Sequence, residues 1–311
     1  MTGVHADVWG APLWSAALLA AGVYATAVID AAAAARIAGA RLEPTVVVEP
    51  LRRAAVLAVQ QRAATERPDL AAWLLAPSLY VALAAAGLSV VPWSSTFAVA
   101  DVRAGIVVWG TVESLVIVAI FLHGWSANAH QPLVAGYRFL AVGLSYLLLS
   151  MFVLIAAAIP AESLAVSDIV VAQRDLWNVV RQPLGFPLFV IVALGSATWG
   201  PLDLAGGADL AGGTTADVSG VPLLVWRAAR AAMLTSFAAM AATVFLGGWQ
   251  GPWLPQPVWV AVKTLLVLAV LVVAGHTVAR TRAERFVTVC WVVLLPLGFV
   301  DLAMAGVEAL R

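Results

Sequence analysis

Long apolar runs alternate with short polar breaks along almost the whole chain. A helix needs roughly 20 apolar residues to cross the hydrocarbon core of a bilayer. Eight runs meet or approach this length: residues 11–35, 70–91, 105–122, 139–159, 184–198, 221–246, 258–279 and 287–305. The fifth run is the shortest and needs help from its flanks to cross. The pattern predicts an all-α, polytopic membrane protein with about eight transmembrane helices.

One further apolar segment, residues 46–61, differs from these runs because Arg52 and Arg53 interrupt it. It is too charged to span a bilayer and predicts an interfacial amphipathic helix. No Lys or Arg precedes the first long run, so that run is expected to be a retained span and not a signal peptide. Without a convincing internal repeat, residues 1–311 are interpreted as a single integral membrane domain.

Composition supports lipid as the solvent for much of the surface. Apolar residues make up 63% of the chain and charged residues only 11%, whereas soluble domains carry about 25% charged residues. The mean hydropathy is +0.97. The net charge of zero gives no bulk attraction to nucleic acid. With Cys290 as its only cysteine, the chain cannot form an internal disulfide or build an iron–sulfur site from its own thiolates.

Arginines are concentrated in the odd-numbered loops. These loops hold Arg36, Arg41, Arg52, Arg53, Arg62, Arg67, Arg138, Arg280, Arg282 and Arg285, whereas the even-numbered loops hold Arg103, Arg174 and Arg181. Short loops rich in Lys and Arg face the cytoplasm. With eight spans, both termini are therefore predicted outside and the odd-numbered loops inside.

The loop at residues 201–220 is long for a connection between packed helices. It is rich in glycine and carries Asp203, Asp209 and Asp217, with no basic residue. Long ordered loops are often functional. Its glycines lack the Lys-Ser/Thr of a phosphate-binding loop and the strand context of a dinucleotide site, which excludes nucleotide binding.

Several short segments, in order and over nearly the whole chain, together resemble one family. They are Glu49-Pro50-Leu51, Gly124-Trp125-Ser126-Ala127-Asn128, Arg138, Ser145-Tyr146, Pro201-Leu202-Asp203-Leu204, Ser219-Gly220 and Phe245-Leu246-Gly247-Gly248-Trp249-Gln250-Gly251-Pro252. This set is similar to the quinone-site membrane subunit of proton-pumping NADH:quinone oxidoreductase (complex I), known as the H subunit in bacteria. Eight spans with cytoplasmic odd-numbered loops also match that family.

The chain departs from the family pattern chiefly at acidic positions. Leu147 follows Ser-Tyr where the family has Glu, and Arg230 replaces a Glu in the sixth span. Gln60-Gln61 replaces Lys-Glu, Gly195-Ser196-Ala197-Thr198-Trp199-Gly200 replaces Ala-Glu-Thr-Asn-Arg-Ala, and Ala205-Gly206-Gly207-Ala208 replaces Pro-Glu-Ala-Glu. In the family these acids line the quinone cavity and link it to proton channels. The resemblance therefore implies a retained scaffold with a reduced carboxylate network.

The resemblance implies a membrane subunit that forms part of a quinone cavity, anchors the hydrophilic arm and is coupled to proton translocation. Ubiquinone or menaquinone would be the substrate, other membrane and hydrophilic subunits the partners, and the bacterial inner membrane the location. The chain is expected to carry no catalytic redox residue and no metal, so electrons would come from a partner. Candidates for the cavity or proton path are Glu113, Arg138, Tyr146, Asp203, Asp209, Asp217 and Arg230.

Each candidate also has a structural interpretation. Glu113, in the middle of the third span, is either a relocated proton-relay carboxylate or a partner for Arg227 or Arg230, because buried opposite charges pair. Arg227 and Arg230 share one helix face and either line a cavity or extend to the cytoplasmic surface. The loop aspartates contact a partner or are simply solvated. The histidines are scattered, which is typical of interfacial residues and not of a metal site. These are His5, His123, His130 and His276.

Two other functional classes remain open at this point. Related membrane subunits anchor energy-converting hydrogenases and formate hydrogenlyases, which need no quinone, and missing cavity acids fit that interpretation. A non-catalytic structural paralogue keeps the same scaffold without chemistry. A secondary transporter is disfavoured, because no inverted repeat is evident.

Overall fold

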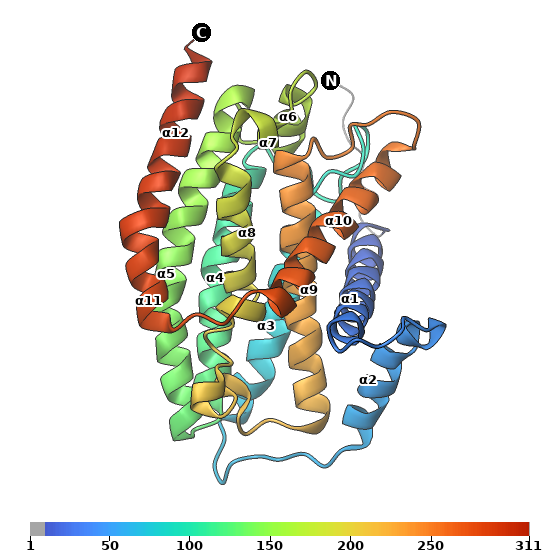
Figure 1. Ribbon diagram of the computed structural model, residues 1–311, viewed down its shortest axis with the longest axis vertical. Helices are drawn as coiled ribbons and strands as arrows, with labels where there is room; N and C mark the ends of the chain where they lie inside the picture. Colours follow the sequence, from blue (N-terminus) through green and yellow to red (C-terminus); the bar gives the residue numbers. More distant parts are fainter. Residues whose placement is uncertain (1–9, 311) are drawn as a thin grey trace.

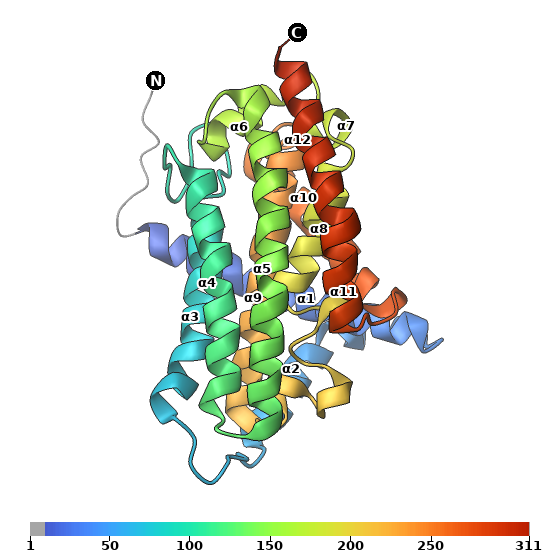
Figure 2. The ribbon, with the colours of Figure 1, turned by 90° about the vertical axis from the view of Figure 1, so that its left-hand side faces the viewer.

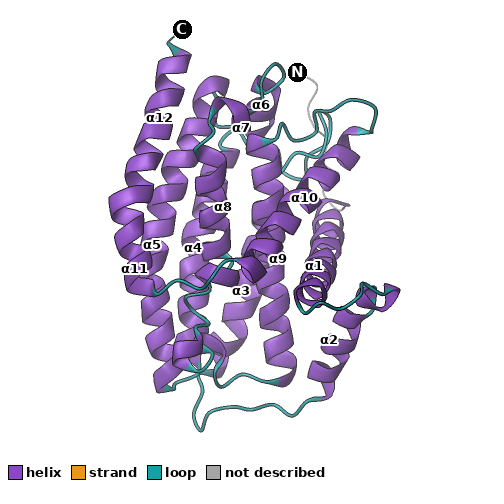
Figure 3. Ribbon diagram, viewed as in Figure 1, coloured by secondary structure: helices purple, strands orange, loops and turns teal. Residues whose placement is uncertain are grey.

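A computed structural model describes residues 10–310, except for the side chains of residues 11 and 208. His5 lies outside this range. Seven helical segments in the described part are long and apolar enough to cross a membrane. They are α1 (Gly10–Ile37), α3 (Leu70–Ser89), α4 (Gly105–Ser126), α5 (His130–Ala158), α9 (Gly220–Phe245), α10 (Gln256–Thr277) and the continuous run of α11 (Ala283–Val289), the π-helical turn η6 (Cys290–Leu294) and α12 (Leu295–Ala309). Figure 3 shows helices joined by loops, which confirms the all-α polytopic fold.

The fifth expected span forms a shorter helix than the others. Helix α8 (Gly185–Ser196) has 12 residues and is preceded by two short helices, α6 (Val166–Ala172) and α7 (Asn178–Arg181). At 1.5 Å per residue α8 covers about 18 Å, well short of a bilayer core. It lies between α5 and α9 inside the bundle (Figure 1), so protein surrounds its ends. A short, mostly buried helix thus stands at the place of the fifth expected span.

Helix α9 forms the centre of the bundle. Every residue from Ala231 to Phe245 is buried, and α1, α3, α8 and α10 pack around it. Small side chains allow this close packing in a membrane, where hydrophobic burial alone gives little drive. The Thr235 hydroxyl on α9 lies 3.3 Å from that of Thr26 on α1. Figure 2 shows α4 and α5 side by side on another face of the bundle.

The two ends of the bundle differ in charge. The first loop, the α4–α5 turn and the loop from 197 to 219 lie at the lower end in Figure 1. The α5–α8 and α9–α10 connections and the C-terminal end of α12 lie at the upper end. The first, third and fifth loops therefore share one end, whereas the α10–α11 connection lies near mid-height in Figure 1. Which end faces the cytoplasm stays a prediction.

The interfacial helix is present as expected. It comprises the 3-10 turn η1 (Pro44–Val47) and α2 (Glu49–Val59), and neither contains a buried residue. Leu51, Val56 and Val59 are exposed, while Arg53 forms an ion pair with Glu49 at 2.9 Å. An exposed apolar face beside paired charges suits a helix that lies in the headgroup region.

The family-like motif at the α4–α5 turn holds two loops together. Asn128 adopts a left-handed backbone with φ of 47°, and its side-chain amide donates to the carbonyl of Arg67 at 3.0 Å. The backbone N–H of Asp69 donates to the carbonyl of Ser126. Asp69 then caps α3 by accepting from Ala71 and Ala72. This motif is thus explained by structure: it fixes the start of α3 against the end of α4.

The glycine motif after α9 ends that helix at the upper end of the bundle. Gly247 and Gly248 have φ of 71° and 47°, a region that glycine adopts without steric cost. The N–H of Gly248 donates to the carbonyl of Ala242 at 3.0 Å, which closes the last turn of α9. The Gln173 side chain accepts from Gly247, and Lys263 donates to three carbonyls of the same turn.

Candidate functional site at the loop face

The long glycine-rich loop folds compactly over the lower end of the bundle. It contains three short 3-10 turns, η3 (Gly200–Leu202), η4 (Ala208–Leu210) and η5 (Gly213–Thr215). The N–H of Thr214 donates to the carbonyl of Ala205 at 3.0 Å, and the N–H of Thr281 donates to that of Pro201 at 3.1 Å. The loop is therefore ordered by its own backbone and by the α10–α11 connection.

Of the three aspartates in this loop, Asp203 is the most buried and accepts a hydrogen bond at each carboxylate oxygen. One of its oxygens accepts from Arg230 at 2.8 Å, and the other accepts from the backbone N–H of Gly206 at 2.9 Å. The Asp203 side chain is 8% exposed and that of Arg230 is 18% exposed. The Arg230 guanidinium also lies 5.8 Å from the centre of the Trp199 ring. These contacts join the loop to the first half of α9.

The second acidic residue of the loop pairs at its rim. Asp209 accepts from Arg138 of α5 at 2.6 Å, with the Asp209 side chain 61% exposed and that of Arg138 22% exposed. An exposed pair contributes little to stability, so this contact orients the rim more than it stabilises the fold. Asp217 is half-buried and has no ion pair within residues 10–310. Of the three loop aspartates, two meet arginines and one does not.

The loop and the α10–α11 connection enclose a polar cavity of about 430 Å³, the loop basin. It is lined by Arg138, Asp203, Leu204, Gly207, Asp209 and residues 280–284. Arg280 and Arg282 are exposed at its edge. The basin thus brings together candidates from α5 and the long loop with arginines of the last loop. Its charges can hold a polar or anionic group at the membrane surface.

Tyr146 lies deeper than the basin and does not line it. The side chain is 1% exposed, and its hydroxyl has no hydrogen-bond partner in the described chain. Its ring packs on Phe286, with ring centres 4.8 Å apart, and covers Gly195 of α8. A Cβ atom at Gly195 would overlap the Tyr146 ring. The lack of a side chain at Gly195 therefore makes room for the tyrosine.

This contact gives a steric prediction. Gly195→Ala is expected to lower the free energy of unfolding by about 1–3 kcal/mol, because the methyl group forces Tyr146 out of its position. In a Tyr146→Ala background the same glycine change should cost less than it does beside the tyrosine ring, measured by denaturant titration in detergent. As a control, Gly306→Ala on α12, where a Cβ meets nothing within 4 Å, should change stability little. Equal losses for the two alanine variants would contradict the steric explanation.

Glu113 is buried away from the basin, between α4 and α5. Its carboxylate accepts from the Ser150 hydroxyl at 2.5 Å, and its other oxygen has no described partner. The predicted pair with Arg227 or Arg230 is wrong, since Arg230 binds Asp203 and Arg227 is exposed. The prediction failed because the rotation of α4 turns Glu113 toward α5 and not toward α9. Its role as a proton carrier stays a prediction.

An aromatic cluster beside Arg230 was not found from the sequence. The ring of His123 stacks on that of Trp226 at 3.6 Å and 8°, and Tyr80 lies 5.3 Å from the same tryptophan. His123 is 4% exposed and lies in the last turn of α4, so these rings bury it near the end of that helix. His276 instead pairs with Asp30 at 2.8 Å, which joins α10 to α1. The three aromatic residues come from separate spans, so no local pattern relates them.

Metal binding finds no support in these side chains. Within residues 10–310, no group of three or more His, Cys, Asp or Glu residues could hold a metal ion. The chemistry of the loop face is therefore that of guanidinium, carboxylate and aromatic groups. These can bind and orient a polar ligand and hold or pass protons.

The fold and the loop face define a polytopic α-helical integral membrane protein with a charged basin at one end. The profile of the NADH dehydrogenase family matches residues 11–306, and the chain belongs to that family. This confirms the resemblance seen in the motifs.

Three curated relatives illustrate the family, and each is an H subunit of NADH-quinone oxidoreductase. The chain is 32% identical over 240 residues to H subunit 1 of Rhodopseudomonas palustris (strain BisB5), covering 77% of this chain and 75% of the relative. It is 31% identical over 249 residues to the H subunit of Geobacillus kaustophilus, covering 78% and 74%. It is 29% identical over 276 residues to H subunit 1 of Geobacter metallireducens, covering 86% and 84%.

Proposed function

We propose that the chain is a membrane subunit of a complex I-type NADH:quinone oxidoreductase, in which it forms part of the quinone cavity and anchors the hydrophilic arm. The observation that carries the proposal is the loop basin, where the Arg138–Asp209 and Arg230–Asp203 pairs meet at the end of a membrane bundle. The names of the relatives support this assignment.

The side chains of the basin suit the polar end of a quinone. Guanidinium groups donate to quinone oxygens and stabilise the negative charge that develops during reduction. Reduction takes up two electrons and two protons. The electrons come from a redox centre of a partner, and Asp203 and Asp209 lie where they can pass protons to the headgroup. This subunit thus binds and orients, while the partner carries out the redox step.

The exposed rim suits a hydrophilic partner. Arg280 and Arg282 stand at the basin edge without an ion pair in the described chain. Complementary charge guides association and excludes wrong partners. The arginine-rich end would face the cytoplasm of a bacterial inner membrane, where the positive-inside rule places it. The hydrophilic arm would then dock from that side.

The test is purification of the native assembly through a tag on this chain. We expect hydrophilic redox subunits to copurify, with inhibitor-sensitive NADH:quinone reductase activity. In the Arg280→Glu/Arg282→Glu variant, charge reversal at the rim should weaken docking of those subunits roughly tenfold. Arg174→Glu, an exposed change at the opposite end, is the control and should leave docking unchanged. An assembly without any hydrophilic redox subunit would defeat the proposal.

The anchor of a hydrogenase-type complex is the second candidate. It is favoured by the neutralised acids of the basin, because Asp203 and Asp209 are both paired with arginine. The same purification separates the two functions. A copurifying nickel–iron large subunit, with no NADH-oxidising subunit and no quinone reductase activity, would establish the second.

A further inference from the structure

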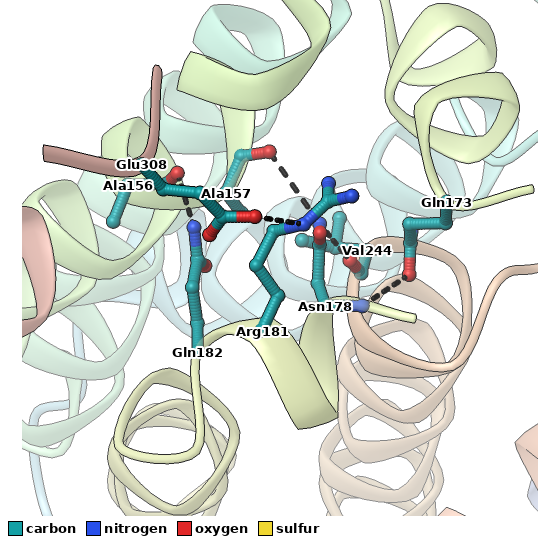
Figure 4. A network of polar contacts seen from close by, with 8 residues as sticks. All are labelled: Ala156, Ala157, Gln173, Asn178, Arg181, Gln182, Val244 and Glu308. Carbon is teal, nitrogen blue, oxygen red and sulfur yellow. Dashed lines mark hydrogen bonds and ion pairs between the residues drawn. The ribbon is translucent and has the colours of Figure 1, made fainter. Parts of the chain in front are cut away.

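A second polar region lies at the upper end of the bundle, opposite the loop basin. Figure 4 shows Arg181 beside Glu308, with Gln173, Asn178 and Gln182 nearby. Arg181 and Glu308 form an ion pair at 2.9 Å between α7 and the end of α12. Gln182 donates to the carbonyl of Ala156 at 2.5 Å. The region joins the short helices α7 and α8 to α5, α9 and α12.

Several atoms of this region are buried without a hydrogen-bond partner in the part of the chain that the structure describes. They are Oδ1 of Asn178, Oε1 of Gln182, Nη1 of Arg181 and both carboxylate oxygens of Asp301. Buried polar atoms are nearly always paired, and those without a protein partner commonly bind water. The unpaired atoms include both acceptors and a donor, as a hydrogen-bonded water chain requires. The region is therefore suited to hold water inside the bundle.

Asp301 is the innermost acid of the region. It is 0% exposed, and its carboxylate lies against Gly185 at the start of α8. A Cβ atom at Gly185 would stand 2.9 Å from Oδ2 of Asp301. Asp301 and Glu308 are seven residues apart and share one face of α12, about 10 Å apart along its axis. Arg181 and Gln182 come four and three residues before Gly185 in the chain, and Arg181 contacts Glu308.

No described cation is free to neutralise Asp301. The titratable or charged groups nearest to it on the elements packed around it are Tyr146 on α5, Glu162 after the turn η2 (Ile159–Ala161), Arg181 on α7, and Cys290 and Glu308 on the same continuous helix. The same elements also carry His130, Tyr137 and Arg138 in the first nine residues of α5, and Glu284 and Arg285 in the first turn of α11. Helix α8 carries none, and the arginines of α9 stand near its opposite end. Arg181 is engaged by Glu308. A buried carboxyl group in such surroundings holds a proton in preference to an unpaired charge.

We propose that Asp301 is a proton-exchange site that opens to the membrane face opposite the loop basin, through Gln182 and the Arg181–Glu308 pair. In each exchange the O–H bond of the Asp301 carboxyl breaks and its proton passes to a water molecule, which becomes a hydronium ion. A hydronium ion then returns a proton to the carboxylate and becomes water again. Glu308 is 44% exposed and Arg181 13%, so their pair stands between Asp301 and solvent. Use of the exchange in proton translocation rests on the proposed function, whereas the exchange itself does not.

The exchange is tested with dicyclohexylcarbodiimide, an apolar reagent that adds to protonated carboxyl groups. Sealed membrane vesicles of both orientations, containing the native assembly, are labelled while the pH is changed on one side only. The modified peptides are mapped by mass spectrometry. We expect Asp301 to be labelled, and its labelling to follow the pH on the α12 C-terminal side. Once most of the Asp301 carboxyl groups are ionised, labelling falls about tenfold per further pH unit, as the protonated fraction does.

Variants decide between this site and a structural carboxylate. Asp301→Asn should abolish labelling of the peptide that contains residue 301. Glu113→Gln, which removes a different buried acid, should leave labelling of that peptide unchanged. Glu308→Gln should alter the rate of labelling without moving its sidedness. If Asp301 is instead fixed as a carboxylate at the start of α8 by the helix dipole, it will not react at any pH. Absent labelling, or labelling that follows the pH of the loop side, would overturn the inference.

A second measurement separates the inference from the proposed function. In vesicles with quinone reductase activity, Asp301→Asn should lower the number of protons moved per quinone reduced and leave the reductase rate unchanged. Failure of the proposed function shows as missing reductase activity in the unmodified assembly, while labelling of Asp301 persists. An unchanged proton ratio in Asp301→Asn would remove the role in translocation and leave only the exchange.

Discussion

Replacing Lys263 by methionine is expected to lower the free energy of unfolding by about 3 kcal/mol or more. Lys263 is the only lysine in the chain and is 6% exposed on α10. Its ammonium donates to the carbonyls of Leu246, Gly248 and Gln250 at 2.6, 3.0 and 2.6 Å. These carbonyls belong to the turn that ends α9, so methionine leaves three acceptors without their donor. Each such buried acceptor costs about 1–3 kcal/mol.

Two controls isolate this effect. The Lys263 ammonium also lies 4.4 Å from the centre of the Trp177 ring, a contact that Lys263→Arg can retain in part. Val262→Met places the same side chain on the neighbouring exposed position of the helix. Unfolding is followed by denaturant titration in detergent micelles. Equal stabilities of Lys263→Met and Val262→Met would show that the three hydrogen bonds do not hold the turn.

Removing the charge of Asp203 is expected to have the largest combined effect on stability and activity. Asp203→Leu leaves the Arg230 guanidinium largely buried without its acid and frees the loop from α9, at a cost of about 3 kcal/mol. The double variant Asp203→Leu/Arg230→Met should lose less than the sum of the single losses, because the pair is removed together. Quinone reductase activity of the purified assembly should fall in each single variant, because the basin loses one wall.

The same pair offers a charge exchange as a sharper test. Asp203→Arg/Arg230→Asp keeps opposite charges in contact and should regain part of the stability lost by either single reversal. Asp217→Asn is the matched control, because this third loop aspartate has no ion pair in the described chain, and it should change stability by less than about 0.5 kcal/mol. Additive losses in the double variants would show that Asp203 and Arg230 act independently.

The family motifs show why recognition from sequence succeeded while the site was found only in part. Asn128 and Gly248 are needed for backbone conformations that a local sequence dictates, so their pattern persists at fixed spacing. The partners of Glu113 and His123 depend on which neighbour each helix turns toward, and the sequence does not show this. For Glu113 the alternative of an arginine pair is wrong, because its carboxylate accepts from a serine, and His123 stacks on a tryptophan of another span.

Asp203 and Arg230 illustrate a partnership that spacing cannot reveal. They are 27 residues apart, and one lies in a loop without regular periodicity. Glu308 and Arg181, and likewise Asp301 and Gly185, belong to segments far apart in the chain that meet only when α12 packs beside α7 and α8. The resemblance directed attention to Asp203 but gave no indication of the polar region at the opposite end.

The sequence by itself determined the membrane setting, the long spans, the interfacial helix and the family. These follow from the free energy of moving each segment from water to lipid, which adds up along the chain and needs no knowledge of neighbours. Only the tertiary structure decided that a short buried helix stands at the fifth expected span, that Arg230 pairs with Asp203, and that Asp301 lies at the start of α8 without an ion pair among residues 10–310. Such pairings depend on the rotation and relative height of packed helices, which long-range contacts set.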